Sequence, residues 1–235
     1  MAVILEKQRV VLRFEDTVLM TENYGVAESD KLNLSVCSGD LVLMRLARLE
    51  QTSTFADACA GINRPATGAV YFLGRNWPEL PPDQANALRG RIGRVFRTGN
   101  WINHLALIEN ILLCQLHHTR RSARQLRDEA AVLAAQFGLP GVPLGLPGNS
   151  TAADLQRAAC VRAFLGRPAL ILLEEPTAGI YLEIISALMN AVRQARERGA
   201  AVIWLTRKNL IWNDQTLPAT QRYRLVAGKL MEVTT

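Results

Sequence analysis

Residues 41–65, LVLMRLARLEQTSTFADACAGINRP, have the layout of a phosphate-binding unit but lack the residues that bind phosphate. The segment opens on four consecutive apolar residues, as a buried strand does, and it closes like a helix that runs into a turn. A glycine-rich loop between such a strand and helix lets backbone N–H groups surround a phosphate chain, while a lysine neutralises its charge. Residues 45–52 contain neither glycine nor lysine. The sequence therefore predicts the strand and the helix of a phosphate-binding unit without the groups that bind phosphate. Residues 45–51 can instead extend the following helix.

The usual metal-binding residues show no metal-binding pattern. The four cysteines form no CxxC pair, and no histidine stands at metal-ligand spacing from them. They are typical of small core residues in a reducing compartment. His117 and His118 are adjacent, so on a helix they point in different directions, as surface residues would. We expect no metal site built from these residues.

Composition and charge limit the partners and the compartment. The chain has 235 residues, 49% of them hydrophobic and 20% charged, enough for one globular domain with a subdomain. The formal charge of +6 permits an anionic partner, but the arginines are scattered among acids, which favours a solvated basic surface. Charges come too early in residues 1–16 for a signal peptide, and His104 and Glu109 make residues 101–116 too polar to span a bilayer. We expect a cytosolic protein, or one held at a membrane by other chains.

The elements that must position any site alternate between strands and helices. Three strands, at 40–44, 168–176 and 200–207, are apolar without alternation, as strands are when both faces are covered. Other segments read as β at 10–14, 32–36, 68–75 and 91–97, and as helix at 53–60, 101–118, 121–137, 152–165 and 182–198. Residues 222–233 read as a hairpin turning near Ala227, and the stretches around PELPPD and over 138–150 as loops. This alternation predicts an α/β layered fold with a parallel sheet.

The order of these segments resembles the ATP-binding subunits of ABC transporters. The matching stretches are SGD (38–40), AGINRPATGAVYFLGR (60–75), IGRVF (92–96), HLALIEN (104–110), QRAACVRAFLGRPALILLEEPTAGI (156–180) and VIWLT (202–206). The stretch 156–180 is the most specific, because its Arg-Ala pair, apolar run, two acids and Pro-Thr-Ala-Gly rarely arise together. The resemblance implies a P-loop NTPase-like core with a parallel sheet, an N-terminal antiparallel β part and a helical subdomain. It places the core in residues 1–97 and 166–235 and the helical subdomain, with the signature loop, in 98–165.

The phosphate loop aligns with that family's pattern without a gap, so its residues carry over one by one. The loop glycines fall on Leu46, Leu49 and Gln51, and the lysine falls on Thr52. Ser53 keeps the magnesium-binding hydroxyl, and Thr54 follows it. A β-carbon at a left-handed position costs roughly 1–2 kcal/mol and each lost charged hydrogen bond roughly 1.5–3 kcal/mol. Together these losses are on the order of 5 kcal/mol, enough to move a micromolar site beyond millimolar.

The other motifs of the family are altered as well. The glutamine that links the magnesium site to the membrane subunit falls on Arg97, and the switch histidine falls on Arg207. The magnesium-associated aspartate is Glu174, while Glu175 keeps the general base or is simply the polar end of a buried strand. The aspartate of the loop that follows falls on Tyr181. The signature loop, Leu-Ser-Gly-Gly-Gln in the family, is Ser150-Thr151-Ala152-Ala153-Asp154, which keeps a hydroxyl but neither glycine.

These changes together predict a chain that does not hydrolyse ATP. Phosphoryl transfer consists of positioning and charge stabilisation, and the groups that supply both are missing. Tyr24 either stacks on adenine or belongs to an ordinary Tyr-Gly turn. We expect no resident cofactor: ATP and magnesium would bind only weakly, or at a site shared with a partner.

The resemblance also implies partners. ABC ATP-binding subunits work as face-to-face pairs, and a groove from about Arg97 to Gln115 receives a helix of the membrane permease. Trp101, Ile102 and Leu105 line that groove or belong to the ordinary core. Residues 98–113 resemble the ATPases that serve MCE-type lipid transporters. We therefore expect a non-catalytic partner of an active ATPase beneath a permease, peripheral to the cytoplasmic face of the inner membrane.

Three alternatives stay open at this point. The first is a scaffold that holds a permease together without nucleotide. The second, suggested only by the basic pI, is a nucleic-acid-associated protein of the ABC fold, although the chain has a single ATPase unit and no long insertion. The third is residual ATP hydrolysis through an unusual loop, with Glu175 as its base.

Overall fold

A six-stranded sheet divides the protein into two layers. In the computed structural model, residues 9–19, 31–226 and 229–233 are described. The sheet has the order β10-β9-β3-β8-β7-β6, and its five strands other than β10 are parallel. The strands are β3 (Leu41–Leu46), β6 (Ile92–Val95), β7 (Leu170–Glu174), β8 (Ala201–Thr206), β9 (Gln221–Val226) and β10 (Lys229–Glu232). The expected α/β architecture with a parallel sheet is confirmed.

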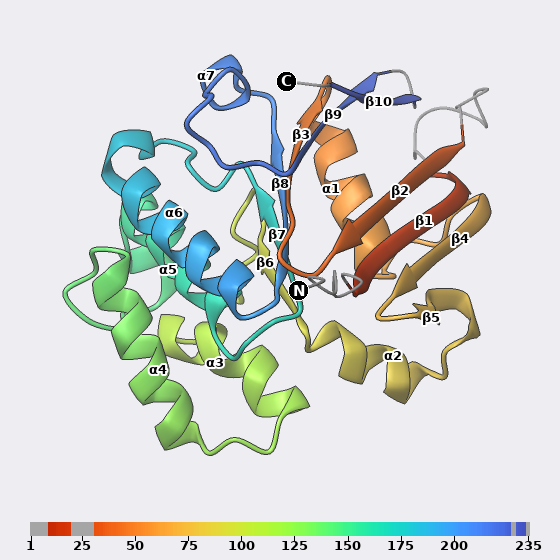
Figure 1. Cartoon of the computed structure of the whole chain (residues 1–235). Coiled ribbons are helices and arrows are strands. Elements are labelled where there is room, and N and C mark those ends of the chain that lie inside the picture. The colour runs from red at the N-terminus through yellow and green to blue at the C-terminus, as the bar shows by residue number, and fades with distance from the viewer. Residues whose placement is uncertain (1–8, 20–30, 227–228, 234–235) are drawn as a thin grey trace, which may run out of the picture.

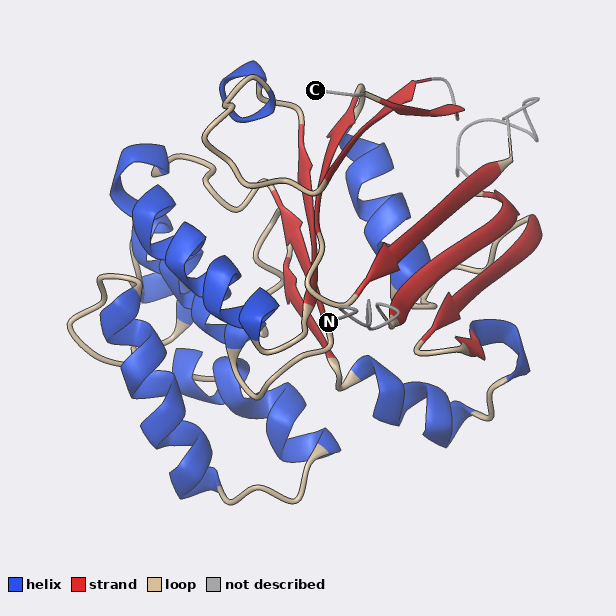
Figure 2. Cartoon of the chain, in the orientation of Figure 1, coloured by secondary structure: helices blue, strands red, loops and turns tan. Residues whose placement is uncertain are grey.

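Helices cover one face of this sheet, and a second sheet lies beyond the other (Figure 1). The helical layer contains α3 (Leu107–His118), α4 (Ala123–Gln136), α5 (Ala152–Phe164) and α6 (Tyr181–Glu197). On the opposite side, α1 (Leu49–Cys59) lies between the parallel sheet and an antiparallel sheet of order β2-β1-β4-β5 (Figure 2). The antiparallel strands are β1 (Val10–Val18), β2 (Leu32–Cys37), β4 (Thr67–Phe72) and β5 (Arg75–Asn76). Short helices complete the chain: η1 (Trp77–Glu79), α2 (Pro82–Arg89), η2 (Pro147–Asn149) and α7 (Asn209–Trp212).

Two hydrophobic cores follow from the period-two geometry of the central strands. In β3, Leu41 and Leu43 face the core beneath α3 to α6, whereas Val42 and Met44 face the core around α1. The strands β7 and β8 alternate in the same way and are completely buried. A fully apolar strand is required here because both of its faces are covered. The carboxyl ends of these strands therefore share one edge of the sheet, where polar side chains can emerge.

Several predicted boundaries were wrong, for identifiable reasons. The helix expected at 101–118 begins only at Leu107, because the side chain of Asn110 binds the backbone N–H and C=O of Ile102 and holds residues 101–106 in a loop. The strand expected at 68–75 is interrupted by a tight turn, since Leu73 and Gly74 both have positive φ. The region around PELPPD was expected to be a loop, yet Pro82 occupies the first turn of α2.

Other elements lie within a few residues of their expected bounds. The strand expected at 168–176 is shorter in the structure, Leu170–Glu174, and the first antiparallel strand is longer than expected, Val10–Val18. The C-terminal hairpin is present as β9 and β10, while its turn at 227–228 lies outside the described residues. No helix in the part of the chain that the structure describes is long and apolar enough to cross a membrane.

Candidate functional site

The connection between β3 and α1 is two residues long. Strand β3 ends at Leu46, and α1 begins at Leu49, so only Ala47 and Arg48 lie between them. The helix thus extends into the segment where a phosphate loop would lie, as residues 45–51 permitted. Five described non-glycine residues have positive φ, and none of them lies between residues 41 and 59. Without left-handed residues, the backbone N–H groups do not curl into a concave phosphate cradle.

The side chains in this segment serve the fold. Leu46 is 2% exposed and belongs to the core around α1. Thr52, at the expected lysine position, is completely buried, and its hydroxyl has no hydrogen-bond partner among the described residues. The Gln51 side chain accepts a hydrogen bond of 3.1 Å from the backbone N–H of Arg48, an N-terminal cap of α1. None of these three side chains provides a positive charge.

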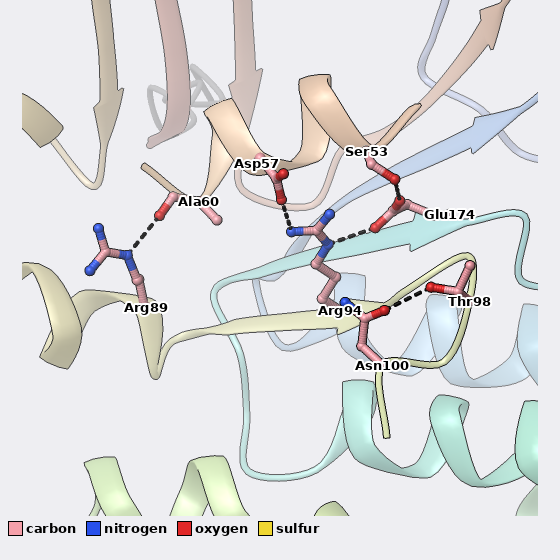
Figure 3. A network of polar contacts seen from close by, with 8 residues as sticks. All are labelled: Ser53, Asp57, Ala60, Arg89, Arg94, Thr98, Asn100 and Glu174. Atoms are coloured by element: carbon pink, nitrogen blue, oxygen red, sulfur yellow. Dashed lines mark hydrogen bonds and ion pairs between the residues drawn. The ribbon is translucent and has the colours of Figure 1, made fainter. Parts of the chain in front are cut away.

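The predicted magnesium-binding pair, Ser53 and Glu174, belongs to an internal ion cluster (Figure 3). The Ser53 hydroxyl donates to Glu174 Oε2 at 2.9 Å, and Arg94 Nε donates to Glu174 Oε1 at 2.6 Å. A second Arg94 nitrogen, Nη1, binds Asp57 at 2.6 Å. Ser53 and Asp57 are one helical turn apart on α1 and so point together toward Arg94 on β6 and Glu174 on β7. Each Glu174 oxygen thus has a partner inside the protein.

The central ion pair of this acid cluster is buried, whereas Asp57 at its margin is 27% exposed. The side chains of Arg94 and Glu174 are 7% and 1% exposed. A buried carboxylate is tolerated only when it is paired and hydrogen-bonded, and the guanidinium supplies both the charge and the donors. The Arg94 guanidinium also lies over the Phe96 ring, 4.4 Å from its centroid. Its position is therefore fixed from two sides.

Glu175, the predicted general base, is turned toward the end of β8. Its carboxylate accepts hydrogen bonds from the Thr206 hydroxyl at 3.1 Å and from the backbone N–H of Arg207 at 2.5 Å. Glu175 has φ +46, and its own N–H donates to the carbonyl of Leu205. The structure therefore brings Glu175 and Arg207 together, although through the Arg207 backbone. The guanidinium of Arg207 is exposed.

The predicted signature loop is the capped start of a helix. Thr151 is the N-cap of α5, and its hydroxyl accepts a hydrogen bond from the Asp154 N–H at 3.1 Å. Asp154 also forms an ion pair with Arg157, which in turn binds Glu183 on α6. Ser150, Thr151, Ala152 and Ala153 are exposed or half-buried. The Thr-x-x-Asp pattern is a known helix start, so this cap was visible in the sequence but was not predicted.

The predicted permease groove begins at an exposed turn. Arg97 is exposed just after β6, whereas Trp101, Ile102 and Leu105 are half-buried. Arg162 on α5 lies beneath this loop: its Nη2 donates to the carbonyl of Gly99 at 2.6 Å, and its guanidinium lies 4.3 Å from the Trp101 ring centroid. Burial lowers the pKa of Arg162 to about 10. One half-buried cation thus holds the loop that precedes α3.

Three further predicted positions have different outcomes. Tyr24 lies outside the described residues, so its proposed stacking on adenine stays a prediction. Tyr181 begins α6, and its hydroxyl is 3.4 Å from Asp214 Oδ2. Burial, followed by the charge and hydrogen bond of Asp214, raises the pKa of Tyr181. Thr54 lies half-buried on α1.

A magnesium–nucleotide held by Ser53 and Glu174 does not fit these contacts. A cation at Ser53 would lie next to the Arg94 guanidinium and would compete with it for the charge of Glu174. The described residues contain no group of three or more His, Cys, Asp or Glu side chains placed to hold a metal ion. Thr52 lies on α1 with its hydroxyl buried, so it provides no phosphate ligand. Ser53, Glu174 and Thr52 are the positions at which the resemblance to ATP-binding subunits predicted contacts with magnesium and phosphate.

Sequence reasoning missed the central residue of the acid cluster. Arg94 stands in the short strand IGRVF, where a charged residue among apolar ones signals a buried partner. Its partners Glu174 and Asp57 are 80 and 37 residues away. Ser53 and Asp57 have i,i+4 spacing, so the sequence also allowed the prediction that they share one helix face.

Comparisons with known proteins agree with this architecture. The family model described as ABC transporter matches residues 52–178, more than half of the chain. The chain belongs to the ABC transporter family of ATP-binding domains. A solved ATP-binding subunit of an ABC transporter superposes on this ABC domain with TM-score 0.81 and 19% identity, covering 95% of this chain and 90% of that one. MJ0796, a bacterial ABC transporter cassette solved as a dimer, gives TM-score 0.79 at 19% identity, covering 95% and 99%.

Curated relatives of this ABC domain carry ATP-binding names. The octopine permease ATP-binding protein P of Rhizobium meliloti is 25% identical over 196 residues, which cover 79% of this chain and 75% of that protein. The macrolide export ATP-binding/permease protein MacB of Chromobacterium violaceum is 26% identical over 182 residues, covering 77% of this chain but only 28% of the relative. The chain thus spans most of the first relative and a small part of the second.

Proposed function

We propose that this ABC domain is a non-hydrolysing subunit of a transporter, paired with an active ATPase beneath a membrane permease. The observation that carries the proposal is the two-residue connection between β3 and α1, which replaces the phosphate cradle. Backbone donors that surround the phosphates supply most of the positioning in this class of site. A helix that begins at Leu49 leaves no loop to supply them.

The acids that would complete the chemistry support the same conclusion. Glu174 is neutralised by Arg94, and Glu175 accepts from Thr206 and from the Arg207 backbone. A general base must be within reach of the attacking water, and a magnesium ligand must have a free oxygen. In this proposal both carboxylates stabilise the fold, so the chain has no resident magnesium or ATP. Nucleotide would bind only weakly, or at a site shared with the partner's intact loop.

The partners follow from what the relatives are called. The octopine relative is named as the ATP-binding protein of a permease, MacB combines ATP-binding and permease in its name, and MJ0796 was solved as a dimer. We infer that this chain likewise binds a permease, through the loop of Trp101, Ile102 and Leu105, and pairs with a second ABC subunit. It would then lie at the cytoplasmic face of the inner membrane, peripheral through the permease.

We further propose that the transported substrate is a lipid of the kind moved by MCE-type systems. This proposal rests on the resemblance of residues 98–113 to the ATPases that serve those systems. The two curated relatives described above are named instead for octopine and macrolide transport. An experiment on partners must therefore distinguish these classes by identifying the permease itself.

The test is purification of the chain, tagged and at its native level, after gentle solubilisation of membranes. The proposal expects a permease and an ABC ATPase with intact motifs, and ATP hydrolysis only in the mixed complex. Leu105→Ser should release the permease, whereas Val132→Ser, another apolar-to-polar change at a 69% exposed position on α4, should not. A permease without an ATPase, retained regardless of ATP, would favour the scaffold alternative. Recovery of neither partner would overturn the proposal.

A further inference from the structure

Exposed arginines gather where α3 ends and α4 begins, at the lower end of the helical layer in Figure 1. Most arginines of the chain are scattered among acids, but residues 117–127 hold four arginines, two histidines and no acid. Arg120, Arg124 and Arg127 are exposed, and no carboxylate among the described residues forms an ion pair with any of them. The exposed acid Asp128 follows this run without pairing with these three arginines. Their charges are therefore available to an external anion.

Two more exposed arginines come to this place from other parts of the chain. Gly90, just after α2, packs so closely that a β-carbon on it would lie 2.4 Å from the Cβ atom of the last residue of α3, which brings Arg91 beside that helix end. The residue before Arg167 donates its N–H to Glu129 on α4 at 3.0 Å, and Glu129 also pairs with Arg121. Neither Arg91 nor Arg167 has a carboxylate partner in the described part of the chain. We refer to the exposed arginines without an ion pair at this place as the basic surface, which consists of Arg91, Arg120, Arg124, Arg127 and Arg167.

The basic surface lies at the amino ends of two parallel strands. Arg91 directly precedes β6, and Arg167 lies shortly before β7. Because β6 and β7 are parallel neighbours, both arginines are at one edge of the sheet. Glu174 and Glu175, where the resemblance placed ATP chemistry, are at the opposite edge, at and just after the end of β7. The basic surface is therefore separate from the candidate nucleotide site.

Exposed leucines on α3 lead up to these arginines. Leu113 and Leu116 are 44% and 43% exposed, and residues three or four apart share one face of a helix, so both lie on the face that ends at His117. Leucines beside arginines are typical of surfaces that enter a bilayer interface. Surfaces that bind single-stranded nucleic acid instead stack bases on aromatic side chains, and residues 113–127 contain no Phe, Tyr or Trp. The composition of this surface therefore favours a lipid partner over a nucleic acid.

Helix α3 connects the basic surface to the loop proposed to bind the permease. The helix begins at Leu107, directly after the loop of Trp101, Ile102 and Leu105, and its 12 residues are about 18 Å long. The basic surface thus lies about one helix length from the proposed permease contact. A peripheral subunit can touch both its permease and the surrounding lipid over such a distance.

We propose that the basic surface binds the anionic headgroups of a bilayer, with Leu113 and Leu116 entering the interface. Each arginine close to an anionic membrane raises the affinity about fivefold, and exposed leucines add an apolar contribution that salt does not screen. The choice of lipid rests on the proposed function, because that function places the chain beneath a membrane. Binding of this kind gives the subunit a second attachment to the membrane, in addition to its permease.

The test is sedimentation of the purified full-length chain with vesicles of phosphatidylcholine and phosphatidylglycerol in equal amounts, and with vesicles of phosphatidylcholine alone. The chain should bind the first and not the second, and sodium chloride should weaken binding because it screens the charges. The double variant Arg120→Gln/Arg124→Gln should bind about twentyfold more weakly. Arg75→Gln/Lys208→Gln, which removes the same charge from exposed positions elsewhere, is the control and should bind like the wild type. Thermal melts check that each variant is folded.

A leucine variant separates a bilayer from other polyanions. Leu113→Ser/Leu116→Ser should weaken vesicle binding about fivefold, because it removes the apolar contribution. Absence of binding that depends on phosphatidylglycerol, or equal binding by the arginine variant and the wild type, would overturn the proposal. Tighter binding to random-sequence RNA than to vesicles, lost in the arginine variant, would also overturn it, because the surface would then be a nucleic-acid site. The vesicles contain no protein, so these results are independent of the proposed partnership, which is tested by co-purification.

Discussion

Charged side chains on the two faces of the parallel sheet differ in whether they have a partner of opposite charge. Toward α1, Arg94, Glu174, Asp57 and Ser53 form a closed cluster in which every charged group has a partner within the protein. On the opposite face, the register partners Arg45 and Arg224 line a cavity of about 420 Å³, and neither has a carboxylate partner among the described residues. The first arrangement resembles a core and the second a binding site.

This difference distinguishes charged side chains that are committed to the stability of the fold from charged side chains that remain available to a ligand. A buried charge must be compensated at all times, so an internal guanidinium that neutralises Glu174 commits that position to stability. Unpaired cations at a sheet edge remain stable because water solvates them until an anion arrives. The ABC frame is kept, and in our proposal its catalytic position has become structural.

Removing the internal cation should be severe. Arg94→Met leaves Glu174, 1% exposed, as an uncompensated buried charge, and should lower the free energy of unfolding by roughly 3–5 kcal/mol in urea titrations. The double variant Arg94→Met/Glu174→Leu removes both charges and should recover most of this loss. A loss below about 1 kcal/mol for the single variant would mean that the cluster is not the closed unit described.

Added magnesium should test the acid cluster next. Magnesium chloride alone, at the same ionic strength as a sodium chloride control, should leave the unfolding midpoint unchanged. Stabilisation by magnesium alone would show that the acid cluster opens to a metal, contrary to the account.

Thr151 gives an intermediate case, a polar group that is exposed yet paired. Thr151→Ala removes the hydroxyl that caps α5 and should cost about 1 kcal/mol in unfolding free energy. Thr151→Ser keeps the cap and should stay near the wild type. If both variants behave alike, the threonine contributes through something other than its hydroxyl.

The smallest effect is expected from a cavity arginine. Arg45→Gln breaks no ion pair among the described residues and relieves repulsion from Arg224, so stability should change by no more than about 0.5 kcal/mol. The same charge change at Arg94 should be far larger, which makes the two positions a matched pair. A loss of 2 kcal/mol or more at Arg45 would show that this arginine is structural and would contradict the contrast between the two faces.

Local patterns predicted the frame, and long-range pairing decided the rest. The apolar runs of β3, β7 and β8 were visible because both strand faces are buried, and the lack of glycine after Met44 anticipated an early start of α1. The helix α2 was missed because prolines read as loop, although proline suits the first turn of a helix.

The sites were only partly predictable. Glu174, Ser53 and Arg207 were named from motif positions, and the structure places each at the carboxyl edge of the sheet or beside it. Arg94 joined them only through contacts across 80 and 37 residues. Arg45 and Arg224 are brought together by the register of β3 with β9, which the sequence does not encode in any local pattern.

The most direct test of the central claim is ATP hydrolysis by the purified chain at high protein concentration, with magnesium, in a single-turnover assay. The account predicts a rate no greater than that of buffer alone, and the same rate for Glu175→Gln, because Glu175 holds Thr206 and Arg207 instead of a water molecule. Magnesium-dependent turnover that disappears in Glu175→Gln would contradict it, since it would show that this carboxylate still acts as a general base.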